Sequence, residues 1–395
     1  MASITIGPPA TGEDFFDRET LLEDIWEAVS KGSVLLAAPR RVGKTSLMLR
    51  MRDKPPKDHM IFFIEAEDFS TPEELVTDLI VKSVKVQPRL QRFLKSVLSS
   101  LVSNIEELEI WEIRLKLREH LRGEWKEKGT QAIQELLSVG PRCLLLIDEL
   151  SILLHKLGVD PKGLHAAAEL LHWLRGLRQE FTGKLSMVLG SSIGMGRIAA
   201  HLGASRTLND LRQVEVGAFD PQTARQFAES LLESRGLPVD EQTMQALLSQ
   251  VETYIPMFIQ IMVDALSKEV RNRKIKPTPE LVRWCYEERV HGPEFRPHLE
   301  DYYERLDRYY TPNEARAAKR ILRDLAISEQ GISRSTLFDA FMHELGLAGG
   351  SEQFDLLLAA LENDFYVTIG SREERVRFHN TWLRDWWRRY HGLGS

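Results

Sequence analysis

The 395-residue sequence lacks several features that mark particular classes of protein. Its two cysteines, Cys143 and Cys285, are too few for a disulfide framework. No apolar run approaches the roughly 20 residues of a membrane span, and no basic region followed by an apolar stretch opens the chain. The 52 Lys and Arg against 58 Asp and Glu give a net charge of −6, which differs from the basic balance of proteins that coat nucleic acid. We therefore expect a cytoplasmic protein that does not bind a membrane.

What the sequence does contain is ordinary globular material. The hydrophobic fraction is 43% and the charged fraction 28%, which are values typical of folded domains. At about 150 residues per domain, the length predicts two or three domains.

The strongest motif is a candidate phosphate-binding loop. The apolar run 34–38 predicts a strand and 47–51 predicts a helix, which is the setting that such a loop needs. Against the pattern G-x-x-x-x-G-K-[ST], Gly43, Lys44 and Thr45 match and Ala38 replaces the first glycine. Lys44 would reach the β and γ phosphates and Thr45 would coordinate Mg²⁺. The candidate nucleotide-binding residues are Ala38, Pro39, Arg40, Arg41, Val42, Gly43, Lys44, Thr45 and Ser46.

A second motif supports the first. The apolar run 144–147 predicts a buried parallel strand that leads directly into Asp148 and Glu149. Asp148 would hold the metal, directly or through water, and Glu149 would polarise the attacking water. This acid pair is typical of the NTPase branch with an extra strand between the two motifs. Together the motifs predict ATP and ADP binding, Mg²⁺ dependence and ATP hydrolysis.

Three more strands are predicted at 61–64, 185–189 and 214–216. The second of these ends in Gly190, Ser191 and Ser192. Either serine could hydrogen-bond the γ-phosphate or the attacking water, while a polar turn without a catalytic role stays an open alternative.

An insertion is predicted at about 83–140. Within it, Ile113, Leu115 and Leu117 alternate with the basic residues between them. This period of two predicts a small hairpin among helices. The hairpin would either bind a partner or be an amphipathic addition that packs on the sheet.

Helical patterns fill much of 222–288 after Asp220-Pro221, which predicts a helical lid. A winged helix is predicted next, from three helices followed by two strands. The helices are expected at 315–327, 333–345 and 351–363, and the strands at 366–369 and 375–378. The expected domains are therefore 1–219, 220–311 and 312–395, the last being the winged helix.

The charges of the winged helix bear on DNA binding. A winged helix normally places its third helix in the major groove, but the segment 351–364 carries four acidic residues and no Lys or Arg. DNA contact through the wing and tail stays open, because these are basic: Arg372, Arg375, Arg377, Arg384, Arg388 and Arg389.

The ordered set of motifs resembles a known group. It comprises the segments 7–9, 15–19, 38–46, 146–150, 190–194 and 378–387. Nearly the whole chain resembles the prokaryotic archaeal-type ATPases among the STAND NTPases, which are relatives of AAA+ and origin-recognition ATPases. The resemblance implies an α/β P-loop NTPase with an ASCE/AAA+-like parallel sheet, followed by a helical lid and a winged helix.

The resemblance also implies roles for three further residues. Arg18 lies in a segment similar to the one that these proteins place near the nucleotide base. Pro256 matches the proline of their G-x-P lid motif. His379 lies in Phe-His-Asn, comparable to the Met-His-Asp triplet that senses the ADP β-phosphate.

The function expected from this resemblance is an ATP-hydrolysing switch that couples nucleotide state to opening, homo-oligomerisation and engagement of a protein partner. An arginine from a neighbouring subunit would assist hydrolysis, and Arg175, Arg178 and Arg197 are candidates. Two alternatives stay open. One is an ATP-dependent DNA-binding initiator or loader of the origin-recognition type. The other is a nucleotide-binding scaffold that barely hydrolyses ATP.

Overall fold

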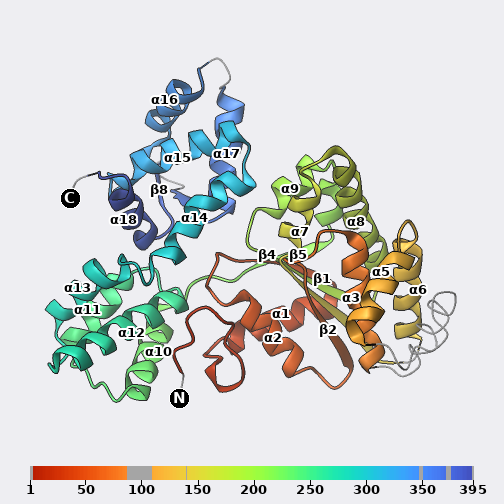
Figure 1. Ribbon diagram of the computed structural model, residues 1–395, viewed down its shortest axis with the longest axis horizontal. Helices are drawn as coiled ribbons and strands as arrows, with labels where there is room; N and C mark the ends of the chain where they lie inside the picture. The colour runs from red at the N-terminus through yellow and green to blue at the C-terminus, as the bar shows by residue number, and fades with distance from the viewer. Residues whose placement is uncertain (1–2, 87–108, 139, 347–349, 371–374, 394–395) are drawn as a thin grey trace. The chain divides into compact units, whose positions relative to one another are not determined.

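The computed structural model describes residues 3–86, 109–138, 140–346, 350–370 and 375–393. These residues group into two compact units (Figure 1). One unit consists of residues 18–38 and 44–216, and the other of residues 1–17, 39–43 and 217–395. The segment 39–43 thus belongs with the C-terminal residues, although it lies in the middle of the predicted phosphate loop.

The first unit is built on a five-stranded parallel sheet with the order β2-β3-β4-β1-β5. Strands β1 to β4 form where the sequence has apolar runs, and β3 buries six of its seven residues. Strand β4 lies between β1 and β3, which confirms the predicted extra strand. The strands are β1 (Ser33–Ala37), β2 (His59–Glu65), β3 (Arg142–Asp148), β4 (Leu185–Ser191) and β5 (Leu211–Glu215).

The register brings chemically important residues to one edge of this sheet. Ala37 pairs with Ser191 and Glu65 pairs with Asp148. Because all strands are parallel, their carboxyl ends share this edge, where α/β sheets bind their ligands. The parallel sheet with flanking helices confirms the predicted α/β fold class.

Helices accompany the strands of the first unit (Figure 1). Asp160 caps one of them by accepting from two backbone N–H groups, with a proline at the first helical position. The helices are α1 (Glu19–Lys31), α2 (Lys44–Asp53), α3 (Pro72–Val86), α5 (Ile110–His120), α6 (Trp125–Leu137), α7 (Leu150–Leu157), α8 (Pro161–Glu180) and α9 (Met195–His201), with a 3₁₀ turn at Ser205–Leu208.

The hairpin predicted around 113–118 is wrong, because this segment lies within helix α5. Figure 1 shows α5 beside α3. Arg114 donates to Asp78 of α3 at 2.7 Å, and Arg118 forms an ion pair with Glu74 one turn away. The alternation arose because the two arginines, four residues apart on one helix face, serve as partners for a neighbouring helix. Other residues of the insertion, 87–108 and 139, lie outside the described residues.

The second unit contains a helical region followed by three helices and a small sheet. A 3₁₀ turn, η1 (Gly12–Asp14), lies in its N-terminal segment. The helical region, expected from the sequence, consists of α10 (Pro221–Ser234), α11 (Glu241–Val251), α12 (Pro256–Arg273), α13 (Pro279–Cys285), a π-helical turn η4 (Tyr286–Val290) and α14 (Arg296–Tyr309). None of the helices in the described part of the chain combines the length and apolar character needed to cross a membrane.

The C-terminal elements follow the order predicted for a winged helix, with one addition. The short strand β6 pairs with β8, so the sheet has three antiparallel strands in the order β6-β8-β7. The elements are α15 (Pro312–Ala326), β6 (Ile332–Ser333), α16 (Arg334–Leu345), α17 (Ser351–Asn363), β7 (Val367–Ile369), β8 (Arg375–Phe378) and α18 (Thr381–Tyr390).

Trp382 joins the last helix to the helical region. Its ring stacks on Phe258 of α12 with centroids 4.4 Å apart, and its Nε1–H donates to the Gln250 carbonyl at 2.8 Å. The side chain is only 1% exposed. The contact therefore buries a large apolar ring and also gives its indole N–H a hydrogen-bond acceptor.

Both cysteines are buried completely, Cys143 in β3 and Cys285 at the end of α13. Burial raises the pKa of each thiol to about 12, so both stay protonated at neutral pH.

We expect Trp382→Ala to lower the free energy of unfolding of the second unit by about 3 to 5 kcal/mol, the usual cost of truncating a buried aromatic side chain. The measurement is thermal unfolding followed by tryptophan fluorescence and circular dichroism. Leu356→Ala is the control, because Leu356 is 63% exposed and its truncation should change stability by less than about 0.5 kcal/mol. Equal unfolding midpoints in the two variants would contradict the anchoring role.

Candidate functional site

The centre of the site is a buried lysine ammonium group. Lys44 begins α2 and is 5% exposed. Its Nζ donates to Asp148 Oδ1 and lies 2.9 Å from Glu149 Oε1. Burial alone would lower the pKa of Lys44, but the carboxylates of Glu149 and Asp148 outweigh burial and raise the pKa above its ordinary value. Lys44 is therefore charged at neutral pH, with two acceptors in reach.

A local twist of the backbone lets two consecutive carboxylates reach the same lysine. Successive side chains of a strand point to opposite faces, so Asp148 and Glu149 would diverge if β3 continued. The strand ends at Asp148, and Glu149 has the left-handed conformation φ 52°, ψ 35°. This conformation is unusual for a residue other than glycine and turns the Glu149 side chain back toward Lys44.

Thr45 and Asp148 together provide oxygen atoms of the kind that Mg²⁺ prefers. The Thr45 hydroxyl donates to Asp148 Oδ2 at 2.6 Å, and the Glu149 backbone N–H donates to Oδ1 at 2.9 Å. The described residues contain no cluster of three or more His, Cys, Asp or Glu side chains able to enclose a metal. A hydroxyl and one carboxylate nevertheless fit Mg²⁺, which commonly takes one or two carboxylates together with waters and substrate phosphates.

The two candidate serines have different surroundings. The Ser192 hydroxyl donates to Glu149 Oε2 at 2.7 Å, so it belongs to the cluster around Lys44. The Ser191 hydroxyl instead donates to the backbone carbonyl of Ile193. Ser192 is thus the serine whose side chain meets the acid pair.

Two residues of this edge were missed by the sequence interpretation. Gly190 leaves the space that the cluster fills, because an added Cβ would lie 2.5 Å from Asp148 Oδ1 and 3.2 Å from Lys44 Nζ. Glu65 ends β2 beside Asp148, and burial followed by repulsion from Asp148 raises the pKa of its carboxyl. The only sequence signals were a glycine and an acid at the ends of apolar runs.

The candidate phosphate loop leaves the sheet at a fixed point. The Ala38 N–H donates to the Ser191 carbonyl at 3.2 Å, so alanine takes the place of the pattern's first glycine without disturbing the sheet. Further on, Arg41 has φ 72° and Gly43 has φ 98°. At Gly43 the conformation favours glycine, which accounts for this position of the motif.

The comparisons with known proteins agree with this fold. Over 98% of this chain and 99% of the other, the structure is similar to a Walker-type ATPase of Pyrococcus abyssi, with a TM-score of 0.62 and 18% identity. The chain has the Walker-type ATPase fold. It is also similar to the ORC2 protein of Aeropyrum pernix, solved in ADPNP and ADP complexes, with a TM-score of 0.53 and 11% identity over 96% of this chain and 98% of that one.

A search of curated sequences gives one relative of more limited extent. An uncharacterised ATP-binding protein of Pyrococcus abyssi is 29% identical over 148 residues, which are 35% of this chain and 43% of that protein. The match thus spans less than half the length of the relative. No family model matches the sequence.

Three predicted site residues lie away from the Lys44 cluster in sequence. Arg18 precedes α1, and its backbone N–H donates to Glu19 Oε2. Pro256 is the first residue of α12. The His379 ring packs on Phe365, and burial lowers its pKa, so the imidazole is neutral at pH 7. Their nucleotide-binding roles stay predictions.

One of the three candidate finger arginines is already used within the Walker-type fold. Arg178 is 7% exposed and binds Asp210 through Nε and Nη2, at 2.9 and 3.0 Å, and the Thr207 carbonyl at 2.7 Å. Burial and these contacts weigh against Arg178 as a finger for a second subunit, and its role stays a prediction. Arg175 and Arg197 are half-buried and stay candidates.

The described arginines of the wing and tail are mostly engaged within the chain. Arg375 donates to the Gly331 carbonyl, Arg384 to Asp385, Arg388 to the Leu393 carbonyl and Arg389 to the Glu287 carbonyl. Arg377 is exposed. Arg372 lies outside the described residues. Four of the arginines that suggested DNA contact thus also hydrogen-bond groups of their own chain.

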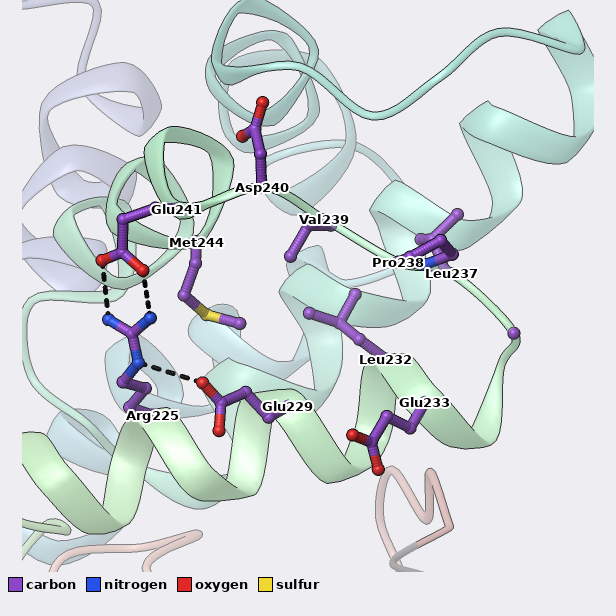
Figure 2. Close-up of a pocket in the computed structure, with 11 residues that line it drawn as sticks. Arg225, Glu229, Leu232, Glu233, Leu237, Pro238, Val239, Asp240, Glu241 and Met244 are labelled. Carbon is purple, nitrogen blue, oxygen red and sulfur yellow. Dashed lines mark hydrogen bonds and ion pairs between the residues drawn. The ribbon is translucent and has the colours of Figure 1, made fainter.

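A separate cavity of about 430 Å³ lies between α10 and α11 (Figure 2). Arg225 closes one side by donating to Glu229 and Glu241 at 3.0 and 2.8 Å. Its floor is apolar, and Leu232 and Met244 are almost fully buried. None of the lining residues is a predicted site residue, so the cavity does not compete with Lys44 as the candidate catalytic centre.

We expect Gly190→Ala to disturb the site while leaving the sheet intact, because the new methyl group collides with the buried Asp148 carboxylate. Mg²⁺-dependent nucleotide affinity should fall by about 10-fold or more, measured by calorimetric titration. Gly176→Ala is the matched control, since an added Cβ there meets nothing within 4 Å in helix α8. It should keep full affinity and gain about 0.5 to 1 kcal/mol of stability. Normal affinity in both variants would contradict the arrangement.

Proposed function

We propose that this protein is an ATP-binding and ATP-hydrolysing molecular switch of the STAND or AAA+ type. The observation that carries the proposal is the cluster of Lys44, Thr45, Asp148 and Glu149 at the carboxyl edge of the parallel sheet. The Walker-type ATPase fold and the partial match to a protein named as ATP-binding support it. The proposed nucleotides are ATP and ADP, with Mg²⁺ as cofactor.

Each residue of the cluster has a distinct role in this proposal. Lys44 neutralises the β and γ phosphates, and the Thr45 and Asp148 oxygens hold Mg²⁺, which supplies positive charge to the phosphates when bound. Glu149 accepts the proton of the attacking water. Lys44 and Ser192 each occupy one oxygen of the Glu149 carboxylate. Transfer of Lys44 to phosphate would release one of these oxygens for water, so phosphate binding itself would activate the base.

The switch involves the rest of the chain. We propose a nucleotide-binding domain of residues 1–219, a helical lid of 220–311 and a winged helix of 312–395. Arg18 would lie at the nucleotide base, Pro256 in the lid and His379 near the ADP phosphate. ADP would favour a closed form, and ATP an open form that assembles with further copies or a protein partner.

A DNA-binding initiator is the second candidate, favoured by the element order of the C-terminal region and by the exposed Arg377. Two features weigh against it. Helix α17 carries acidic residues and pairs Asp355 with Arg334, and four arginines of the wing and tail bind groups of their own chain.

We expect Lys44→Ala to abolish ATP binding, because the phosphates lose their buried charge partner. Glu149→Gln should bind ATP normally and hydrolyse it at least about 10²-fold more slowly, since the amide cannot accept the proton. Calorimetry gives the affinity and phosphate release gives the rate.

The control is Glu135→Gln, the same substitution at an exposed position of α6. It should leave both quantities unchanged. Wild-type affinity in Lys44→Ala would refute the site, whereas wild-type turnover in Glu149→Gln would require another base.

Duplex DNA separates the two candidate functions. At about 150 mM salt with ATP, the switch proposal predicts no saturable binding to a duplex of about 40 base pairs in a fluorescence anisotropy titration. Saturable binding that is lost in Arg377→Glu would favour the initiator instead.

A further inference from the structure

Helix α14 contacts the phosphate-loop segment 39–43, with which it shares a compact unit. Arg40 Nη1 lies 2.6 Å from Asp301 Oδ2, and the two side chains are 20% and 21% exposed. The hydroxyl of Tyr302, a residue 2% exposed, lies 3.5 Å from the Arg40 carbonyl. One side chain of the loop and its backbone therefore meet adjacent residues of the same helix.

Asp301 is the acidic group that faces the loop's two arginines. Burial, followed by the charge of Arg40, lowers the pKa of Arg41, while Tyr302 and Asp301 act in the opposite direction. One turn before Asp301, His298 has a lowered pKa because of burial and the charge of Arg41. Arg308 is a third basic group near Asp301, at 3.8 Å. The loop thus carries positive charge that the Asp301 carboxylate of α14 offsets in part.

The same helix is tied to the C-terminal elements by buried polar contacts. The Tyr366 hydroxyl donates to the Tyr302 carbonyl at 2.8 Å, and both tyrosines are almost fully buried. The Tyr310 hydroxyl, just after α14, donates to Asp364 at 2.6 Å. A movement of α14 would therefore involve the region of α17 and β7 as well.

From these contacts we infer that Asp301 is an internal competitor for the nucleotide phosphates: it holds Arg40, which phosphate would otherwise engage. The inference rests on the proposed function, because it assigns the phosphates to the loop. A guanidinium group forms strong charge-assisted bonds with carboxylate and phosphate alike, and the single positive charge of Arg40 neutralises each anion less completely when both share it. Nucleotide binding and the contact of α14 with the loop then oppose each other, and by linkage each weakens the other equally.

The test compares Asp301→Asn with the wild-type full-length protein. The substitution keeps the shape of the side chain and removes its charge. Affinity for ATP and ADP with Mg²⁺, measured by calorimetric titration, should rise about 3- to 10-fold. Asp307→Asn is the matched control on the same helix, because Asp307 pairs with Lys319 and has a side chain 62% exposed. This control should bind like wild type.

A double-mutant cycle shows whether the effect passes through Arg40. In the Arg40→Ala background, Asp301→Asn should no longer change affinity. Unchanged or weaker binding in Asp301→Asn, or an equal gain in the Arg40→Ala background, would overturn the inference. These outcomes are distinct from failure of the proposed function, which would appear as wild-type ATP binding in Lys44→Ala. Thermal unfolding of each variant without nucleotide verifies that it is folded.

Discussion

The burial of one lysine ammonium group between two carboxylates is the interaction on which the candidate site depends. A charge removed from water is costly unless partners surround it, and Lys44 obtains two from adjacent residues of one chain segment. That arrangement constrains the neighbourhood. The strand order places β4 between β1, which precedes Lys44, and β3, which leads into the acids; Gly190 at the end of β4 supplies the space, and Glu149 adopts a left-handed backbone. Stability and chemistry thus draw on the same few atoms.

The sequence was informative where one physical signal dominates. Apolar runs predicted four of the five strands, and a glycine, lysine and threonine after the first run located the lysine of the cluster. Prediction was weaker where contacts between residues distant in sequence determine the local structure or the role of a side chain. Helix α5 has charges that pair with α3, so its pattern resembled a strand. Ser191 and Ser192 are alike in sequence, and only the end of β4 determines which hydroxyl meets Glu149. The three-domain division and the roles of Arg18, Pro256 and His379 stay predictions.

Basic residues illustrate the same difficulty in another way. A sequence counts charges, but it does not say which of them are already neutralised inside the fold. Arg178 looked suited to a neighbouring active site, yet it binds Asp210 and a backbone carbonyl in its own chain. Arg40, by contrast, looked like one variable position of a loop and has a partner about 260 residues away. The ion pairs that matter most for function are therefore those that a ligand could exchange.

The two buried thiols have a practical consequence for studying this protein. Thiol-reactive dyes and spin labels attack the exposed thiolate, and neither Cys143 nor Cys285 presents one. An engineered surface cysteine in each compact unit would be labelled selectively, without removal of the native residues. Pairs of such labels would report the distance between the units by energy transfer or by electron paramagnetic resonance. Such labels would show directly whether the distance between the two units changes when nucleotide is added.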